Sequence, residues 1–188
     1  MNIFERTRIA RGILIAMCFA TAPKTSGQQL KAMTYNVRFD NPGDGENAWE
    51  HRKDYLISQI AWHAPDLVGT QEALLHQLED MDAALPRYAF FGRGRDAGSE
   101  QGEYSAVFYR TDRLDLEASG TFWLSETPQT PSRGWDAALN RICTYGRFRH
   151  RDSGLRFYLF NTHFDHKGQQ ARQEIAAPAR LFAQTAGQ

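Results

Sequence analysis

The stretch FNTHFDH, residues 160–166, decides the fold once it is compared with two earlier segments, MTYNVR at 33–38 and VGTQE at 68–72. Each segment begins with apolar or β-branched residues and ends in polar residues, a pattern that predicts a short buried strand followed by a turn. The three strands would deliver an asparagine, a glutamate and a histidine to their carboxyl ends. We therefore expect these three polar side chains to meet at one edge of a sheet.

The rest of the chain alternates between strand-like and helix-like stretches, which indicates sheets covered by helices. Amphipathic segments that end before Pro65 and Pro86 predict two helices, because proline cannot continue a helix. From residue 88 onward the pattern is rich in β-formers separated by glycine and polar turns. The predicted strands are 30–36, 66–71, 88–91, 104–109, 114–124, 142–150 and 156–162; the predicted helices are 50–63, 74–85 and one from about Gln169, with Pro178 as a predicted break.

Residues 1–27 are predicted to be an export signal peptide, because three arginines precede the apolar run 12–20 and small residues follow it. That run is too short to span a bilayer as a stable anchor, so we expect no membrane anchor after its removal. A buried N-terminal helix is the alternative. The remainder, 28–188, is expected to be the N-terminal portion of one domain that works in the periplasm or outside the cell.

The leader contains four of the 22 basic residues and one of the 22 acidic residues, which leaves 18 basic and 21 acidic residues and a net charge of −3. This balance predicts no bulk attraction to nucleic acid, so a polyanionic substrate would need a local patch or a metal. Cys143 is the only cysteine after the leader. Its position in a β-like run predicts a small core residue rather than a nucleophile.

In this order, the three segments resemble motifs of the endonuclease/exonuclease/phosphatase superfamily, and the resemblance runs from about Leu30 to the last residue. GEYSAVFY at 102–109, GWD at 134–136 and RICT at 141–144 look most like a bacterial branch of mostly uncharacterised hydrolases. The resemblance implies an α/β (α+β) fold of the deoxyribonuclease type, a four-layer α/β/β/α sandwich. It also implies hydrolysis of phosphodiester or phosphomonoester bonds by in-line attack of water.

The resemblance implies a role for each polar strand end. Glu72 would bind Mg²⁺, with Mn²⁺ as the alternative, since these cations prefer oxygen ligands. Asn36 would help to position the metal or a phosphate oxygen, and His163 would hydrogen-bond the scissile phosphate. Glu103 is expected to set the protonation state and tautomer of His163. Without the resemblance, Glu72 would be an exposed residue at a helix start and Asn36 a turn residue.

Three further residues are candidates for substrate binding. We expect Asp165 and His166 to line the cleft from the loop after the last strand, and Arg141 either to contact phosphate or to form a structural salt bridge. His163 and His166 could instead hold zinc, but residues three apart at a strand end do not share a face as they would on a helix.

GRGRDAG at 92–98 lacks the spacing of a dinucleotide fingerprint, and its arginines either contact an anionic substrate or lie on a solvated turn. The long connections 37–49 and 125–140 are predicted to be loops at the rim of the cleft. Trp49, Trp123 and Trp135 would either form walls of that cleft or fill the core.

The resemblance also predicts an Asp-x-Asn tip and a C-terminal Ser-Asp-His that supplies the general base, and neither occurs in these 188 residues. We therefore expect a truncated chain with an incomplete second sheet, inactive and poorly soluble as it stands. A non-catalytic binding module is the alternative, and metal-dependent turnover would distinguish the two. The substrate stays open between a phosphorylated small molecule and an oligonucleotide, and no protein partner can be inferred.

Overall fold

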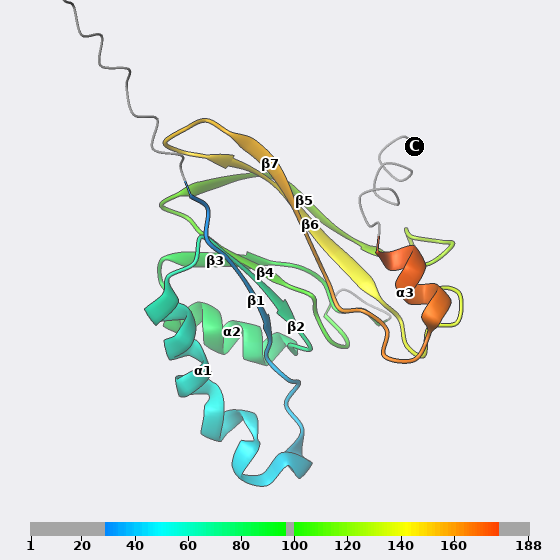
Figure 1. Cartoon of the computed structure of the whole chain (residues 1–188). Coiled ribbons are helices and arrows are strands. Elements are labelled where there is room, and N and C mark those ends of the chain that lie inside the picture. Colours follow the sequence, from blue (N-terminus) through cyan, green and yellow to red (C-terminus); the bar gives the residue numbers. More distant parts are fainter. Residues whose placement is uncertain (1–28, 97–99, 177–188) are drawn as a thin grey trace, which may run out of the picture.

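The computed structural model describes residues 29–96 and 100–176 of the chain, and the predicted signal peptide and Pro178 lie outside them. No helix in this part of the chain is long and apolar enough to cross a membrane. The elements, in chain order, are β1 (Ala32–Asn36), the 3₁₀ helix η1 (Pro42–Asn47), α1 (Trp49–His63), β2 (Leu67–Gln71), α2 (Leu75–Ala84), β3 (Tyr88–Phe91), β4 (Val107–Arg110), β5 (Leu114–Trp123), β6 (Ile142–His150), β7 (Arg156–Thr162) and α3 (Gln169–Ile175) (Figure 1).

The first sheet has the strand order β1-β2-β4-β3, with α1 and α2 covering its outer face (Figure 1). β1 and β2 are parallel, and Asn36 pairs with Gln71 in the register between them. All five residues of β2 are buried, as expected for a central strand. Because two parallel strands in register end at the same edge, the residues after β1 and after β2 lie side by side.

The second sheet consists, within the described residues, of the antiparallel strands β5, β6 and β7. Its inner face packs on the first sheet through Leu114 and Phe148, which contact the core around Leu67 and Val107. On the outer face, Ala171 of α3 belongs to the apolar cluster that includes Cys143. The molecule is therefore layered as helices, sheet, sheet and helix, which is the predicted sandwich.

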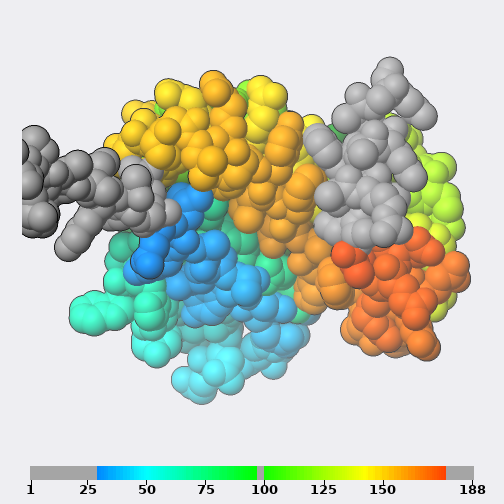
Figure 2. Space-filling view, turned by 45° about the horizontal axis from the view of Figure 1, so that its top comes forward, coloured from blue at the N-terminus to red at the C-terminus, as the bar shows by residue number. Residues whose placement is uncertain are grey.

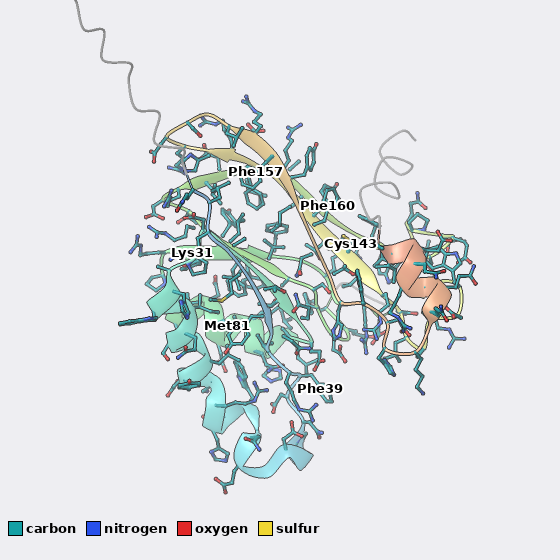
Figure 3. The ribbon with its side chains drawn as sticks, viewed as in Figure 1. Lys31, Phe39, Met81, Cys143, Phe157 and Phe160 are labelled. Atoms are coloured by element: carbon teal, nitrogen blue, oxygen red, sulfur yellow. The ribbon has the colours of Figure 1, made fainter. Side chains whose placement is uncertain are left out.

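Side chains between the layers follow the strand and helix periods. Met81 of α2 is fully buried between the helices and the first sheet, and Phe157 of β7 packs between the sheets (Figure 3). On the face shown in Figure 2, residues of β1 in blue lie beside residues of β7 in orange. The end of β7 is thereby brought close to the end of β1.

The three tryptophans predicted either to form walls of the cleft or to fill the core have mainly core positions. Trp49 is 2% exposed and donates a hydrogen bond from Nε1 to Asp80 at 2.8 Å, and Trp123 is 1% exposed. These two side chains fill the core and are not walls of a cleft. Trp135 is partly buried and packs against the apolar cluster under α3. Cys143 is also buried, and burial raises its pKa to about 12, which fits the predicted core residue.

The connection after β1 is more ordered than its sequence predicts. It contains η1, which begins at the capping residue Asn41 and includes Pro42 in its first turn. Arg52 of α1 donates hydrogen bonds to the backbone carbonyls of Val37, Arg38 and Asn47 at 2.5, 2.6 and 2.8 Å. One partly exposed guanidinium thus replaces the strand and helix partners that this segment lacks.

Candidate active site

Glu72 directly follows β2 and has a left-handed backbone conformation, with φ at 65°. This conformation is unfavourable for a residue with a Cβ and marks a position where the surrounding structure enforces strain. The side chain is 21% exposed at the edge of the sheet. Its Oε1 accepts a hydrogen bond of 2.7 Å from Nδ2 of Asn36, so the ends of β1 and β2 are joined through these two side chains.

The Asn36 amide has a single orientation that satisfies its neighbours. Its Oδ1 accepts a hydrogen bond of 2.9 Å from the backbone N–H of Arg38, while Nδ2 donates to Glu72. A flipped amide would place an NH₂ group against the Arg38 donor and an oxygen against a carboxylate. In this structure Asn36 therefore orients Glu72 rather than offering an oxygen to a metal, and the predicted direct ligation would require the amide to turn.

His163 follows β7 in the second sheet and lies against Glu72 of the first. Its Nδ1 is 4.0 Å from Glu72 Oε1, and within the described residues this buried nitrogen has no hydrogen-bond partner. Burial lowers the pKa of His163 below its ordinary value, Arg141 lowers it further, and Glu72 only partly opposes them. The imidazole is therefore neutral at neutral pH, with one ring nitrogen unused by the protein.

Asn161 fixes the distance between the two sheets beneath these groups. Its Nδ2 donates to the carbonyls of Thr70 and Ala106 at 2.8 and 2.9 Å, and its Oδ1 accepts 2.9 Å from Nε2 of Gln71. A Cβ at Gly69 would lie 2.7 Å from Asn161 Oδ1, so the close approach requires glycine there. The sequence analysis missed this residue, although its strand parity with the inward-facing Phe157 could have revealed it.

Glu103 and Arg95 form a second charged pair near His163. Nη1 and Nη2 of Arg95 donate to the two carboxylate oxygens of Glu103, each at 2.9 Å. Burial raises the pKa of Glu103, and Arg95 counteracts that effect. Glu103 and His163 line the same cleft, but no hydrogen bond joins them among the described residues. The predicted influence of Glu103 on His163 is thus not made by direct contact here, since Arg95 holds the carboxylate.

Arg141 and Asp165 form a buried ion pair below the cleft, with Arg141 Nε 3.1 Å from Asp165 Oδ2. Although burial opposes its ionisation, Asp165 also accepts hydrogen bonds from the backbone N–H groups of Gly168, Lys167 and Ala138, and its pKa lies well below the ordinary value. The Asp165 side chain is completely buried. It organises the loop after β7 and is not among the residues that line the cleft, so the predicted substrate contact of Asp165 stays a prediction.

His166 is exposed at the end of the same loop, and its Nδ1 lies 3.2 Å from Nη2 of Arg141. One of the two ring nitrogens of His166 thus faces a guanidinium. Within residues 29–96 and 100–176, no three His, Cys, Asp or Glu side chains are grouped so that they could hold a metal. The donor set therefore does not fit the zinc alternative.

The donor set does fit a hard cation that keeps most of its water. Mg²⁺ often takes only one or two carboxylates from a protein, and Glu72 supplies one oriented, partly exposed carboxylate. The cleft beside it contains about 10 Å³ of free volume, roughly the room for one water. The described residues that line this cleft are Glu72, Arg95, Glu103, Tyr104, Ser105, Asn140, Arg141, Ile142 and His163.

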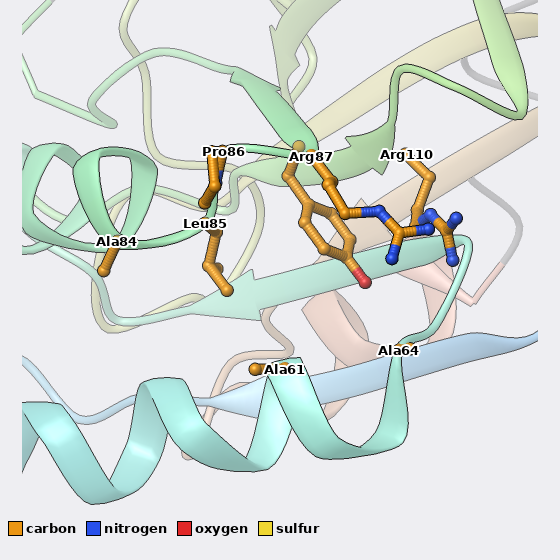
Figure 4. Close-up of a pocket in the computed structure, with 8 residues that line it drawn as sticks. Ala61, Ala64, Ala84, Leu85, Pro86, Arg87 and Arg110 are labelled. Atoms are coloured by element: carbon orange, nitrogen blue, oxygen red, sulfur yellow. The ribbon is translucent and has the colours of Figure 1, made fainter.

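Larger hollows lie elsewhere in the described residues. One of about 580 Å³ lies between the loop after β1 and α1, and Asn36 is the only predicted site residue among its lining. One of about 480 Å³ is lined by Asp96 and residues 131–133 and 138–140, none of which is a predicted site residue. Another, of about 220 Å³, is mostly apolar, and its lining includes Ala61 of α1, Ala64 just after α1, and Leu85 (Figure 4). No predicted site residue lines it. The cleft at Glu72 and His163 is therefore the candidate active site.

A family model described as the endonuclease/exonuclease/phosphatase family matches residues 33–174, which include every predicted site residue. The chain belongs to this family. The family assignment and the deoxyribonuclease-like sandwich, both predicted from the sequence, are confirmed. Members of this family are hydrolases that act on phosphoesters.

Solved structures of family members resemble the chain closely. A crystal structure of an endonuclease/exonuclease/phosphatase family protein from Bacteroides thetaiotaomicron is 46% identical, with a TM-score of 0.79 over 84% of this chain and 59% of that chain. A mannosyl-6-phosphatase from the same organism is 45% identical, with a TM-score of 0.79 over 85% of this chain and 61% of that one.

A curated relative, an uncharacterized protein of Acanthamoeba polyphaga mimivirus, is 31% identical over 134 residues, which cover 68% of this chain and 50% of that protein. The chain thus spans about half the length of this curated relative and about three fifths of the two Bacteroides chains.

Proposed function

We propose that this family member hydrolyses a phosphomonoester of a small metabolite, such as a sugar phosphate, with Mg²⁺ bound at Glu72. The observation that carries the proposal is the 4.0 Å approach of His163 to the oriented carboxylate of Glu72 across two sheets. The 45% identity to a mannosyl-6-phosphatase supports this class of substrate over an oligonucleotide. The net charge of −3 after the leader also gives no support to nonspecific nucleic-acid binding.

Each side chain has a task that its contacts support. Glu72 would hold the cation and Asn36 would keep that carboxylate in place. When bound, Mg²⁺ neutralises charge on the phosphoryl oxygens and favours deprotonation of a bound water. His163, neutral before substrate arrives, would donate a hydrogen bond from Nε2 to a phosphoryl oxygen and so favour the charge that grows in the transition state.

The chain's own residues leave the general base unassigned. The Ser-Asp-His that the family resemblance calls for is not in these 188 residues. The second candidate function is a module that binds metal and phosphate without turnover. Both candidates share the binding half of the site, so they are separated by hydrolysis and not by affinity.

The test is an assay of metal-dependent phosphate release. The 188-residue chain and the Glu72→Gln variant are incubated with Mg²⁺ or Mn²⁺ and sugar phosphates, a phosphodiester and oligonucleotides. Phosphate release that needs metal and is lost in Glu72→Gln supports the phosphatase. Binding of Mn²⁺ and phosphate without release supports the binding module. If the chain binds neither, both candidates are excluded.

Export is part of the same proposal. Three arginines and an apolar run at the N-terminus support a cleaved signal peptide that ends near Gly27. Mass spectrometry of the protein recovered from the periplasm or medium is expected to show a new N-terminus within a few residues of Gly27. Recovery of the intact N-terminus only, from inside the cell, would contradict export.

A further inference from the structure

The cleft beside Glu72 has about 10 Å³ of free volume, which is about the room for one water. A phosphate group that enters this space fully would therefore displace a lining side chain. Two arginines line the cleft, and a guanidinium is a suitable partner for phosphate because its N–H groups match two oxygens at once. Each arginine is paired with a carboxylate, Arg95 with Glu103 and Arg141 with Asp165, and the two pairs differ in how easily the arginine can leave its partner.

Arg141 is not free to move. Its side chain is 4% exposed, its partner Asp165 is completely buried, and Asp165 has three further backbone donors that hold it in place. Withdrawal of Arg141 would leave a buried carboxylate without its charge partner, which is strongly unfavourable. Arg141 therefore supplies a fixed positive charge below the cleft and no mobile contact.

Arg95 differs in every one of these respects. Its side chain and that of Glu103 are 13% and 19% exposed, so both reach solvent. Burial and, less strongly, the nearby Glu72 raise the pKa of Glu103, while Arg95 and, to a smaller extent, Arg141 lower it, so the ionised carboxylate depends mainly on Arg95. Exchange of one oxyanion partner for another at Arg95 thus costs less than at Arg141.

The loop that carries Arg95 does not need the guanidinium to hold its shape. The Arg95 N–H donates to the carbonyl of Glu103 at 3.1 Å, and its carbonyl accepts from Nε1 of Trp123 at 2.8 Å and from Nδ2 of Asn140 at 3.3 Å. At Gly94 a Cβ would lie 1.9 Å from the carbonyl oxygen of Gln101, so the two sides of the loop are in close backbone contact. The backbone is anchored while the side chain can turn.

We propose that Arg95 is a phosphate-binding residue held in reserve, which exchanges the Glu103 carboxylate for the phosphate group of the substrate. The inference rests on the proposed function, because it needs a phosphate bound at Glu72 and His163. Glu103 then acts as a competitor for Arg95 and not only as a support for His163. Arg95 would donate two hydrogen bonds to the phosphate, in addition to the one from His163. This arrangement would favour phosphomonoesters, because their terminal oxygens are free to accept both hydrogen bonds from the guanidinium.

If Glu103 competes with phosphate for Arg95, removal of its charge should raise the affinity for phosphate. If Glu103 instead supports phosphate binding, removal of its charge should lower that affinity. Glu103→Gln should raise the affinity for inorganic phosphate by about 3-fold to 10-fold, because Arg95 no longer has to leave an anion. Arg95→Met should lower it by about 10-fold to 100-fold, since one bidentate charged contact is lost. The double variant should bind like Arg95→Met, because Glu103 acts only through Arg95.

The experiment is calorimetric titration of the 188-residue chain with inorganic phosphate in the presence of Mn²⁺, at constant ionic strength. Arg93→Met is the matched control: Arg93 lies in the same loop and its guanidinium stacks on the Trp123 ring at 5.4 Å, outside the lining of the cleft. It removes the same charge and should change phosphate affinity less than 3-fold. Loss of the free Mn²⁺ signal in electron paramagnetic resonance reports metal binding separately.

The outcomes separate this inference from the proposed function. If the wild type binds Mn²⁺ and phosphate but Arg95→Met binds phosphate equally well, the inference is wrong and the proposed function stands. Equal losses in Arg93→Met and Arg95→Met would show a general charge effect and would also overturn it. A lower affinity in Glu103→Gln would show that Glu103 supports the contact instead of competing. If the wild type binds neither Mn²⁺ nor phosphate, both proposals fail.

Discussion

Two clusters of polar side chains join the sheets, one under the candidate active site and one at the opposite end of β2. At the opposite end Arg113 Nε lies 3.2 Å from Asp66 Oδ1, and Arg113 Nη2 lies 3.3 Å from Nε2 of His150. The other ring nitrogen of His150, Nδ1, lies 2.9 Å from Ser153 Oγ, within hydrogen-bond distance. Asp66 and His150 are each 2% exposed, and none of the hollows described above is lined by this cluster.

Under the active site the sheets are joined by neutral amides, those of Asn161 and Gln71. A neutral link places no competing charge beside Glu72 and leaves its carboxylate available to a cation. One buried nitrogen, Nδ1 of His163, stays unpaired there. Asp66 Oδ1 also lacks a well-aligned hydrogen bond, but the ion pair with Arg113 compensates its charge. The two unpaired atoms therefore differ: the charge of Asp66 is compensated by Arg113, whereas Nδ1 of His163 has no partner among the described residues.

The test with the largest expected effect concerns Asp165, which forms a buried ion pair with Arg141 at the candidate active site. Asp165→Asn removes the partner of the buried Arg141 and should destabilise the protein by about 3–5 kcal/mol at pH 7. It should also weaken phosphate binding, since Arg141 lines the cleft. Urea unfolding monitored by circular dichroism gives the first quantity and calorimetry with phosphate and Mn²⁺ the second.

The effect of Asp165 has a definite pH dependence. Because its pKa is lowered on folding, the ionised carboxylate stabilises the protein above its ordinary pKa of about 4, and this contribution is lost as the pH falls through the folded value. The wild type and Asp165→Asn should therefore converge in stability toward pH 2. A difference between them that is the same at pH 2 and pH 7 would contradict the ionic role.

The opposite cluster should matter for stability alone. Asp66→Ala leaves Arg113 without its partner and should cost about 3 kcal/mol, at the lower end for buried pairs because Arg113 is 34% exposed. Asp112→Ala is the control: the Asp112 side chain is 47% exposed and pairs with the exposed Arg87 and the mostly buried Arg110, and its loss should cost about 1 kcal/mol. Affinity for Mn²⁺ and phosphate should be unchanged in both. If folded Asp66→Ala lost affinity for Mn²⁺ or phosphate while Asp112→Ala did not, the opposite cluster would not be purely structural.

The amide link should affect stability and binding together. Asn161→Ala leaves the carbonyls of Thr70 and Ala106 and the amide of Gln71 with lost partners, a cost of about 2–3 kcal/mol. It should also weaken phosphate binding, because the distance from His163 to Glu72 is no longer fixed. Thr162→Ala, which removes one hydrogen bond to the Ile142 carbonyl at 2.8 Å, should cost about 1 kcal/mol without a change in affinity. Equal effects of the two variants on phosphate binding would refute a positioning role for Asn161.

The strands could be predicted from the sequence because alternation and turn residues are local signals. The predicted bounds of β3, β6 and β7 agree with the structure. β4 begins at Val107 and not at residue 104, because Tyr104 donates its N–H to the Ala73 carbonyl at 2.7 Å and is diverted from the ladder. The 3₁₀ helix η1 was missed, since glycine and proline there indicate a loop and the stabilising Arg52 lies on another element.

The active site was predictable to the same extent. The meeting of Asn36, Glu72 and His163 follows from strand ends, which the pattern reveals. The pairs Arg95–Glu103 and Arg141–Asp165 depend on how loops fold over the sheet edge, and no local pattern encodes them. The sequence therefore indicated the candidate site residues, but it did not indicate which of them form ion pairs within the protein.

The smallest expected effect concerns strain at Glu72. Its left-handed backbone, φ 65°, is shared by Ala64 at the C-terminus of α1, φ 44°, where a glycine is normally preferred. Glycine at either position relieves the strain, and each substitution should stabilise the protein by about 0.5–1 kcal/mol. Thermal unfolding of Glu72→Gly and Ala64→Gly measures this directly.

The two substitutions should differ in binding alone. Glu72→Gly removes the only carboxylate proposed to hold the cation, so Mn²⁺ binding should be lost, whereas Ala64→Gly should bind as the wild type does. A gain in stability together with a loss of metal would show that the fold accepts strain at the position where the carboxylate is needed. A loss of stability in Glu72→Gly would mean instead that the hydrogen bond with Asn36 outweighs the strain, and Glu72 would then be a structural residue as well as a ligand.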